Sequence, residues 1–240
     1  MSRTALVTGG AVRIGRAITE ALAGAGYRVV IHYNSSSGPA EELRDAITAK
    51  GGEARIIGAD LSRTDEVKRL ADEAAAAFGG IDVLINSASV FPAEKLEETD
   101  EALWEQTMGV NLRAPFFLIR HLAHTLRERK GAVINMADLA GLQPWASYAA
   151  HSISKAGVVQ MTKVAARSLA PEVRVNAIAP GAVLPPDDMS QEEVDRLART
   201  APLQRNGSPA DVVRAVLYLL EADFVTGETL VVDGGRLLRT

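Results

Sequence analysis

The chain has 240 residues, of which 26 are Lys or Arg and 30 are Asp or Glu, so its formal net charge is −4. With 47% hydrophobic residues it has the composition of a globular protein, without a basic surface for nucleic acid or anionic membranes. It contains no cysteine, which excludes disulfides, thiolate catalysis and cysteine-ligated metals. We expect one domain spanning residues 1–240, and a cytoplasmic protein, because no apolar run approaches the length of a membrane span.

The opening residues predict a nucleotide site. Residues 4–7 form a short apolar run typical of a buried strand, residues 8–15 contain three glycines, and residues 16–25 have helical spacing of apolar side chains. A strand that breaks into glycines and continues as a helix presents unpaired backbone N–H groups to an anion. Gly9 and Gly15 permit a tight turn and close approach of a pyrophosphate. We therefore expect Gly9, Arg13, Ile14 and Gly15 to contact a dinucleotide.

The end of the second predicted strand, Arg28–Tyr33, bears on cofactor choice. A site for NADH usually has an acidic residue there, which bonds the ribose 2′-hydroxyl and would repel a 2′-phosphate. The loop after this strand has no acid, and Arg13 could add positive charge nearby. This favours NADPH over NADH, and the alternative is a merely solvated polar loop. The predicted phosphate contacts are His32, Tyr33, Asn34, Ser35 and Ser36.

The remaining chain alternates strands with helices. Further strands are expected over residues 54–58, 81–86, 131–136, 174–179 and 229–232, and further helices over 41–50, 64–78, 101–126, 145–170, 191–199 and 209–220. Pro115 predicts a kink in the helix over 101–126, and Ser190 is expected to cap the helix that follows it. The alternation predicts a single-domain Rossmann-type doubly wound α/β fold, with a mostly parallel seven-stranded sheet and helices on both faces.

Several residues at strand ends are candidates for ligand contact. Asp60 could cap a helix or bond an adenine amino group, and the spacing does not choose between these roles. The small residues after Asn86 would let a cofactor pack against the backbone, since open α/β sheets bind ligands at the carboxyl ends of their strands. No group of acidic residues and histidines has convincing metal-ligand spacing, so we expect no metal.

The chain resembles the short-chain dehydrogenase/reductase family over nearly its whole length. The resemblance is carried by the glycine turn, Asp60, the segment 86–88, Asn111, Lys155, the Pro180-Gly181 turn and the terminal Val-Asp-Gly-Gly of residues 232–235. It implies a hydride transfer with a nicotinamide cofactor and a homotetrameric assembly. By this resemblance the cofactor contacts also include Asp60, Leu61, Asn86, Ala88, Lys155, Pro180 and Gly181.

Further residues are similar to the pteridine reductase branch of that family. Arg13 stands where most members have a glycine, Asp138 stands where most have a catalytic serine, and the segment 32–36 is similar to that branch's phosphate-binding stretch. The resemblance implies an NADPH-dependent reduction of an oxidised or dihydro pterin or folate. It also implies a substrate loop over about 182–200, with Asp187-Asp188-Met189 at its centre. The implied substrate contacts are Ser89, Phe91, Asp138, Leu184, Met189 and Arg239.

The chain departs from the family at the proton donor. Members carry a tyrosine four residues before the lysine, on the same helix face, but here that residue is His151 and the nearest tyrosine is Tyr148. A histidine could donate the proton, since its ordinary pKa of about 6.5 is already near working pH. Tyr148, or Asp138 through water, is an alternative donor. The predicted catalytic set is Asp138, His151, Lys155, Asn111 and Tyr148, with Asn111 orienting Lys155 through water.

Two other functions remain open at this stage. One is a general carbonyl reductase of the 3-oxoacyl type, which would use the same cofactor and the same lysine. The other is a nucleotide-binding protein with weak catalysis, because loss of the tyrosine removes the usual acid. Orientation of a hydride donor alone still accelerates the reaction.

Overall fold

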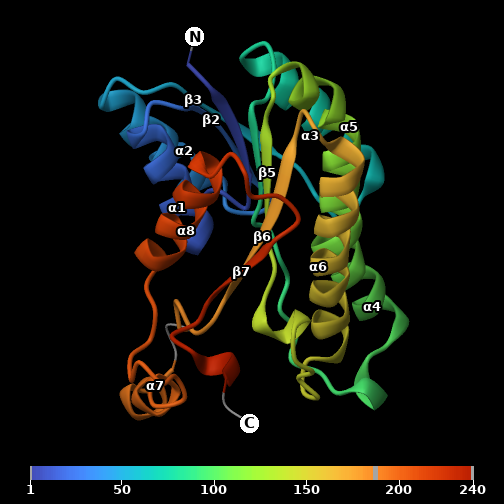
Figure 1. Cartoon of the computed structure of the whole chain (residues 1–240), viewed down its shortest axis with the longest axis vertical. Coiled ribbons are helices and arrows are strands. Elements are labelled where there is room, and N and C mark those ends of the chain that lie inside the picture. The colour runs from blue at the N-terminus through green and yellow to red at the C-terminus, as the bar shows by residue number, and fades with distance from the viewer. Residues whose placement is uncertain (1, 186–188, 239–240) are drawn as a thin grey trace.

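The computed structural model describes residues 2–185 and 189–238, and the predicted contacts Asp187, Asp188 and Arg239 lie outside these residues. The described chain contains one sheet in the order β3-β2-β1-β4-β5-β6-β7, and every neighbouring pair is parallel (Figure 1). The strands are β1 (Thr4–Thr8), β2 (Arg28–Tyr33), β3 (Ala54–Gly58), β4 (Val83–Asn86), β5 (Ala132–Met136), β6 (Arg174–Pro180) and β7 (Thr229–Val232).

Helices cover both faces of the sheet, as expected for a doubly wound fold (Figure 1). One layer consists of α1 (Arg13–Gly24), α2 (Ser37–Ala49) and α8 (Pro209–Glu221). The other consists of α3 (Thr64–Ala77), α5 (Ala114–Glu128) and α6 (Ala149–Leu169), with α4 (Glu101–Met108) beside α6. Beyond the sheet lies α7 (Gln191–Ala198), which Ser190 caps through a reciprocal bond pattern with Glu193. Within the described residues, no helix is long and apolar enough to cross a membrane.

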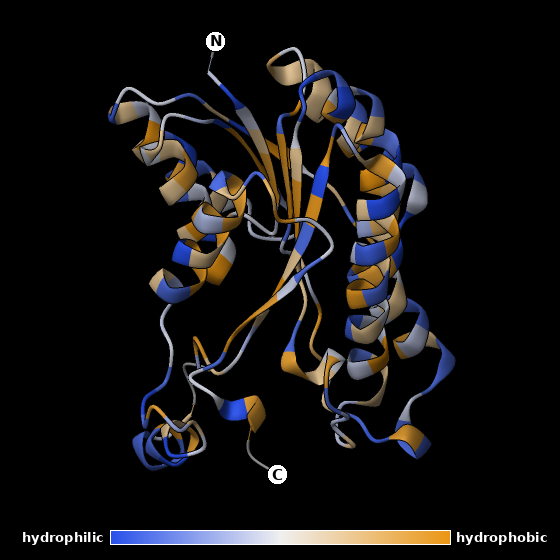
Figure 2. Ribbon diagram, viewed as in Figure 1, coloured by the Kyte–Doolittle hydropathy of each residue, from blue (hydrophilic) through white to orange (hydrophobic). Residues whose placement is uncertain are grey.

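The core lies in two apolar layers, one on each side of the sheet. Successive side chains of a strand point to opposite faces, so in β1 Leu6 packs toward α3 and α5 while Val7 packs toward α1 and α8. Figure 2 shows the central strands as largely hydrophobic, whereas the outer helices alternate between hydrophobic and hydrophilic residues. The continuous burial of β1 is what a parallel strand covered on both faces requires.

The helix expected over 101–126 is present as one helical run, and its distortion before Pro115 is a π-helical segment. The chain runs as α4, then a π-helical segment η2 (Gly109–Arg113), then α5, in which Pro115 stands in the first turn. Pro115 has no N–H to give to the residue four before it, and the wider π turn is closed instead by a bond from the Ala114 N–H to the Gly109 carbonyl. The π segment carries Asn111 into the protein interior.

The helix expected from residue 145 begins only at Ala149. The backbone N–H groups at its start bond to carbonyls outside the helix. Tyr148, the N-cap residue, donates to the Trp145 carbonyl, and Ala149 donates to that of Glu94. Conversely, α2 begins at Ser37, four residues earlier than expected, since Pro39 is tolerated in a first turn. The first shift moves Tyr148 from the predicted helix to the N-cap position of α6, and the second places Ser36 at the N-cap of α2.

Candidate active site

The turn between β1 and α1 is built so closely that glycine is required at two positions. A Cβ on Gly9, whose φ is +61°, would lie 3.0 Å from Cα of Ala88 after β4. A Cβ on Gly15 would lie 2.1 Å from the Gly9 carbonyl oxygen. The turn therefore packs closely against the end of β4, and the first turn of α1 faces the carboxyl edge of the sheet.

Thr8 fixes the end of β4 beside this turn, a role that the sequence reasoning missed. Its hydroxyl oxygen accepts hydrogen bonds from the N–H groups of Ser87 (2.9 Å) and Ala88 (3.1 Å). The signal was a threonine at the last position of the first strand, but its partners lie almost eighty residues away. Thr8 thus holds together the two segments between which a cofactor would pack.

His32 was predicted to contact a phosphate, but its ring nitrogens are bound within the protein. Its ring is buried, Nδ1 accepts from the Gly9 N–H (3.0 Å), and Nε2 donates to the Ala59 carbonyl (3.0 Å). Burial lowers the pKa of His32 to about 4, so the ring is neutral at working pH. With both nitrogens bound inside the protein, the imidazole supports the glycine turn and has no free atom for a phosphate.

The other residues predicted to contact a phosphate differ in how exposed their side chains are. Asn34 and Ser35 are exposed at the carboxyl end of β2, and Ser36 stands at the N-cap position of α2. The ring of Tyr33 packs over Gly58 of β3, where a Cβ would lie 3.0 Å from Cζ. The polar groups still available for a 2′-phosphate are those of residues 34–36 and the first turn of α2.

Arg13 points away from that loop, which corrects the expectation that its charge would lie near a 2′-phosphate. Its guanidinium donates to the carbonyl of Leu184 (2.8 Å), in the loop after β6, and its backbone has a left-handed φ of +52°. In the sheet β6 and β2 lie on opposite sides of β1. Arg13 therefore links the glycine turn to the predicted substrate loop, while its neighbour Ile14 is half-buried against the core.

The carboxylate of Asp60 makes hydrogen bonds within a local turn. Its Oδ1 accepts from the N–H (2.9 Å) and hydroxyl (2.7 Å) of Ser62, and these bonds lower the pKa of its carboxyl. The N-cap of α3 is Arg63, so Asp60 is not the helix cap. Leu61 beside it has a buried side chain in the core, which leaves only its backbone to meet a cofactor.

Asn86 also serves the interior of the sheet. Its amide nitrogen donates to Oδ1 of Asn135 (2.8 Å), and Nδ2 of Asn135 donates to the hydroxyl of Thr162 in α6 (2.9 Å). At the other side of the predicted cleft, Gly181 directly follows β6 and has no room for a Cβ, which would lie 2.8 Å from Asp233. Pro180 is the last residue of β6 and is buried.

Lys155 and His151 lie one turn apart on α6, and both are buried. The Lys155 ammonium donates to the Met136 carbonyl at the end of β5 (2.9 Å). Burial lowers the pKa of Lys155 to about 8, and the negative charge of Asp138 partly offsets that effect. This lysine is therefore a cation that loses its proton in the mildly alkaline range.

Asp138 and His151, both in the predicted catalytic set, lie close together. Oδ2 of Asp138 lies 3.8 Å from Nε2 of His151, while Oδ1 accepts from the Ala140 N–H (2.8 Å) at the start of η3 (Leu139–Gly141). The exposed fraction is 24% for the aspartate side chain and 2% for the histidine. Asp138 is thus the member of the pair that faces solvent, and the histidine lies beneath it.

The side chain of Asn111, which we expected to orient Lys155 through water, makes its hydrogen bonds within the protein. Its carboxamide binds both backbone groups of Val90: Oδ1 accepts from the N–H (2.8 Å) and Nδ2 donates to the carbonyl (3.0 Å). Oδ1 also accepts from the Ser89 hydroxyl (3.1 Å), and Nδ2 donates to that of Ser154 (3.1 Å). An amide has two acceptor and two donor positions, so none remains for a bridging water.

An aromatic cluster covers His151. Phe91 stacks on Tyr148 with ring centres 4.5 Å apart, and meets the His151 ring at right angles, also at 4.5 Å. Trp145 packs edge-on against both Phe91 and Tyr148, and Arg236 of η4 (Arg236–Leu238) lies over the Trp145 ring. Phe91 remains 52% exposed, so it is not a core residue. None of the sequence signals had predicted Trp145 or Arg236.

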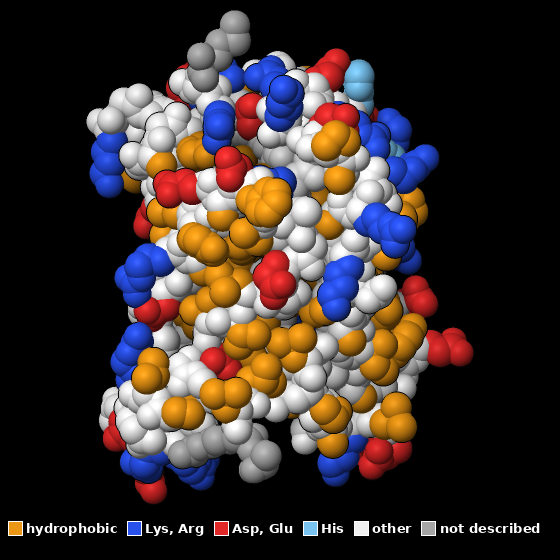
Figure 3. All heavy atoms as spheres, in the orientation of Figure 1, with side chains coloured by type: hydrophobic (Ala, Val, Ile, Leu, Met, Phe, Trp, Pro, Cys, Tyr) orange, Lys and Arg blue, Asp and Glu red, His pale blue; other side chains and the backbone are white. Residues whose placement is uncertain are grey.

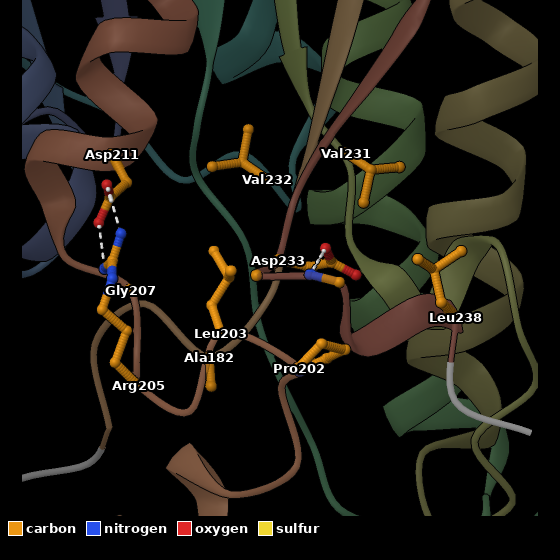
Figure 4. A pocket seen from close by; sticks show the side chains of 12 residues that line it. Ala182, Pro202, Leu203, Arg205, Gly207, Asp211, Val231, Val232, Asp233 and Leu238 are labelled. Carbon is orange, nitrogen blue, oxygen red and sulfur yellow. Dashed lines mark hydrogen bonds and ion pairs between the residues drawn. The ribbon is translucent and has the colours of Figure 1, made fainter.

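A cavity of about 520 Å³ lies at the ends of β6 and β7, and none of the aromatic residues of the cluster lines it (Figure 4). It is lined mainly by apolar side chains, with Arg205 paired to Asp211 on one wall and Asp233 bonded to the Gly235 N–H on another. Of the predicted substrate loop it includes Ala182, whereas Leu184 and the half-buried Met189 lie outside its lining. In the described parts of the chain, no three acidic or histidine side chains are grouped closely enough to hold a metal.

The chain is similar to a family model, to curated proteins and to solved structures. A family model described as enoyl-(acyl carrier protein) reductase matches residues 10–236. The 3-oxoacyl-acyl-carrier-protein reductase FabG of Staphylococcus epidermidis is 36% identical over 244 residues, covering 99% of this chain and all of that protein. Among solved structures, the FolM alternative dihydrofolate reductase 1 of Brucella suis in complex with NADP superposes with a TM-score of 0.94 at 36% identity, covering 99% of this chain and 96% of that one. A metagenomic blue fluorescent protein in complex with NADPH superposes with a TM-score of 0.91 at 31% identity, covering 98% and 97%. From its sequence, its sheet order and these relatives, the chain belongs to the short-chain dehydrogenase/reductase family.

Proposed function

We propose that the protein is an NADPH-dependent reductase that transfers a hydride to a C=N bond of an oxidised or dihydro pterin or folate. The glycine turn fits a dinucleotide, because a Cβ would fill the space at Gly9 and Gly15 and the N-terminus of α1 attracts phosphate. The loop at residues 34–36 offers an amide and hydroxyls and no carboxylate to a 2′-phosphate. Both the FolM and the blue fluorescent protein structures are complexes with NADP or NADPH.

The choice of a pterin or folate rests on one observation, the half-exposed Phe91 ring beside the Asp138–His151 pair. A flat aromatic surface favours a planar heterocycle by stacking, and a carboxylate can accept hydrogen bonds from ring N–H and amino groups. Bound NADPH supplies the hydride. The Asp138–His151 pair of the chain supplies the proton. Lys155 supplies a buried positive charge at the end of β5.

A second candidate is a 3-oxoacyl reductase. It is favoured by the FabG relatives, which align with this chain from end to end at 36% identity. Such a substrate is a ketone on a flexible chain, which gains little from a stacking surface but could occupy the mainly apolar cavity near β7. A protein that binds the nucleotide but turns over slowly is a third candidate, favoured by the burial of His151.

A substrate comparison separates these candidates. NADPH oxidation is followed with dihydrobiopterin, dihydrofolate and a 3-oxoacyl thioester, and NADPH binding is measured by fluorescence titration. We expect turnover of the pterin or folate with a kcat/KM well above that of the thioester. Preference for the thioester would establish the second candidate, and tight NADPH binding without turnover would establish the third.

We further propose that copies of the chain assemble through two apolar faces. Apolar side chains gather over α8 and β7 in Figure 3, where Tyr218 is 54% exposed. On the opposite helical layer, Phe116 of α5 and Val164 of α6 are about half exposed. β7 also ends the sheet within the described residues and leaves one strand edge unpaired. Light scattering after size-exclusion chromatography should show a tetramer, and a monomer would contradict this proposal.

A further inference from the structure

The two ring nitrogens of His151 have unlike surroundings. Nδ1 lies 3.2 Å from the Val90 carbonyl oxygen. Nε2 lies 3.8 Å from the Asp138 carboxylate and is buried without a hydrogen-bond partner among the described residues. A neutral imidazole carries its proton on one nitrogen and accepts with the other. The neighbours of each nitrogen therefore decide which of the two carries it.

The orientation of the Asn111 carboxamide settles what Nδ1 faces. The atom that meets the Val90 N–H must be the amide oxygen, because only an oxygen accepts. The NH₂ group is then directed to the Val90 carbonyl and the Ser154 hydroxyl, which use both of its hydrogens. Although Nδ2 of Asn111 lies 3.5 Å from Nδ1 of His151, it has no hydrogen left to give. Nδ1 faces a carbonyl, which can only accept.

We propose that Asn111 is a positioning residue that holds the Val90 carbonyl against Nδ1, so that the neutral His151 ring is protonated at Nδ1 and only Nε2 gains and loses a proton. The Asn111–Val90 contact joins the π-helical segment to the loop after β4, and Ser154 joins both to α6. Three separate segments thus converge to select one tautomer. The assignment of this proton to the reduction rests on the proposed function, whereas the tautomer itself does not.

The geometry also gives the direction of the proton. Nε2 is buried and faces Oδ2 of Asp138, and the aspartate is the exposed member of the pair. When a substrate C=N carbon takes the hydride, its nitrogen gains an electron pair and accepts one proton from the pair: the imidazolium Nε2–H passes its proton through the Asp138 carboxylate to that nitrogen, which leaves a neutral imidazole and a carboxylate. A proton from solvent then returns to Nε2 by way of Asp138. Among the described residues, the other charged groups of this cluster are Lys155, one turn along α6, and Arg236, which lies over the Trp145 ring.

The test is nitrogen NMR of the full-length protein labelled with ¹⁵N-histidine. The chain has four histidines, and the spectrum of His151→Phe identifies the signals of His151. We expect Nδ1 of His151 at a protonated, pyrrole-like shift throughout a titration, with the large pH-dependent shift confined to Nε2. A neutral ring protonated at Nε2, or an Nδ1 that loses its proton at high pH, would overturn the proposal.

Variants test the part played by Asn111. Asn111→Ala releases the Val90 carbonyl, and we expect the neutral ring to become a mixture of tautomers and kcat to fall more than NADPH affinity. Ser89→Ala is the matched control: it removes a bond to Oδ1 of the same carboxamide but leaves both Nδ2 hydrogens on the Val90 carbonyl and Ser154, so the ring should stay protonated at Nδ1. An unchanged tautomer in a folded Asn111→Ala protein would refute the positioning role. If that variant does not fold, the wild-type titration still decides the tautomer.

These readouts separate the inference from the proposed function. The NMR titration needs no substrate, so a protein inactive on pterins can still show the Nδ1–H tautomer, and then only the proposed function fails. Conversely, an active pterin reductase whose neutral His151 is protonated at Nε2 contradicts only this inference.

Discussion

The glycine turn and the His151 cluster stand at the same edge of the sheet but are built in different ways. In the turn, position is set by lack of space: a Cβ on Gly15 would lie 2.1 Å from the carbonyl oxygen of Gly9 in the same turn. In the His151 cluster, position is set by hydrogen bonds that join residues far apart in sequence, such as Val90 with His151 and Asn111 with Ser154. The first kind of site is local and the second is not, so substitutions should affect the two in different ways.

The effect on both stability and cofactor binding is expected in the glycine turn. Gly15→Ala must displace the Gly9 backbone, and overpacking of this kind costs about 1–3 kcal/mol or more of unfolding free energy. NADPH affinity should be lost with it. Gly24→Ala is the control, because Gly24 also lies in α1 but its Cβ would meet nothing within 4 Å. Urea unfolding and cofactor titration compare the two variants, and equal behaviour would show that the turn is not constrained by space.

In the His151 cluster the effect should fall on the reaction. Asp138→Asn and His151→Phe each remove a proton-transfer group, which typically contributes about 10²–10⁴-fold in rate. NADPH affinity should change little, because neither side chain belongs to the glycine turn. His124→Gln is the control, since that histidine is 88% exposed on α5. Stopped-flow measurement of NADPH oxidation checks this, and full activity of His151→Phe would remove the histidine from the mechanism.

A third effect belongs to the turn and depends on pH. The folded pKa of His32 is about 4, below the 6.5 of an unfolded histidine, so its contribution to stability is complete above pH 6.5 and is lost as pH falls toward 4. The loss should reach about 3 kcal/mol of unfolding free energy. Urea unfolding at pH 7 and pH 4.5 should show a smaller difference between the two pH values in His32→Gln than in the wild type. An equal difference in both proteins would contradict this burial effect.

The smallest effect concerns substrate choice in the cluster. Phe91→Leu keeps an apolar side chain but removes the ring, and an aromatic pair is worth about 0.5–1.5 kcal/mol beyond its area. We expect KM for a pterin to rise by about two- to twelve-fold, the same energy converted, with KM for NADPH unchanged. A KM for pterin that does not move would show that the substrate lies elsewhere.

The same contrast explains how much the sequence predicted. The bounds of β2, β3 and β7 agree with expectation, and so does the parallel sheet, because apolar runs and the alternation of elements are local patterns. The placement of Gly9 and Gly15 was equally predictable, since both depend on the turn itself. Asp138 and His151 were both in the predicted catalytic set, and the structure places the carboxylate 3.8 Å from Nε2 of the imidazole.

What the sequence did not predict depends on distant partners. His32 was expected to be free, but its nitrogens bind Gly9 and Ala59. Arg13 was expected near a phosphate, but it binds a carbonyl 171 residues away. The role of Asn111 follows from a π-helical turn that brings it beside Val90. Such contacts depend on how whole helices and strands pack together. The spacing of residues within one helix or strand therefore does not predict them.

The pH dependence of pterin reduction, measured as kcat/KM from pH 5 to 9, tests the central claim most directly. The account predicts a decline toward high pH, because the Asp138–His151 pair must hold a proton and the buried Lys155 loses its own near pH 8. In His151→Phe the remaining activity should be low, with only the change near pH 8. A wild-type profile that is flat across this range, at a rate limited by the chemical step, would contradict the account.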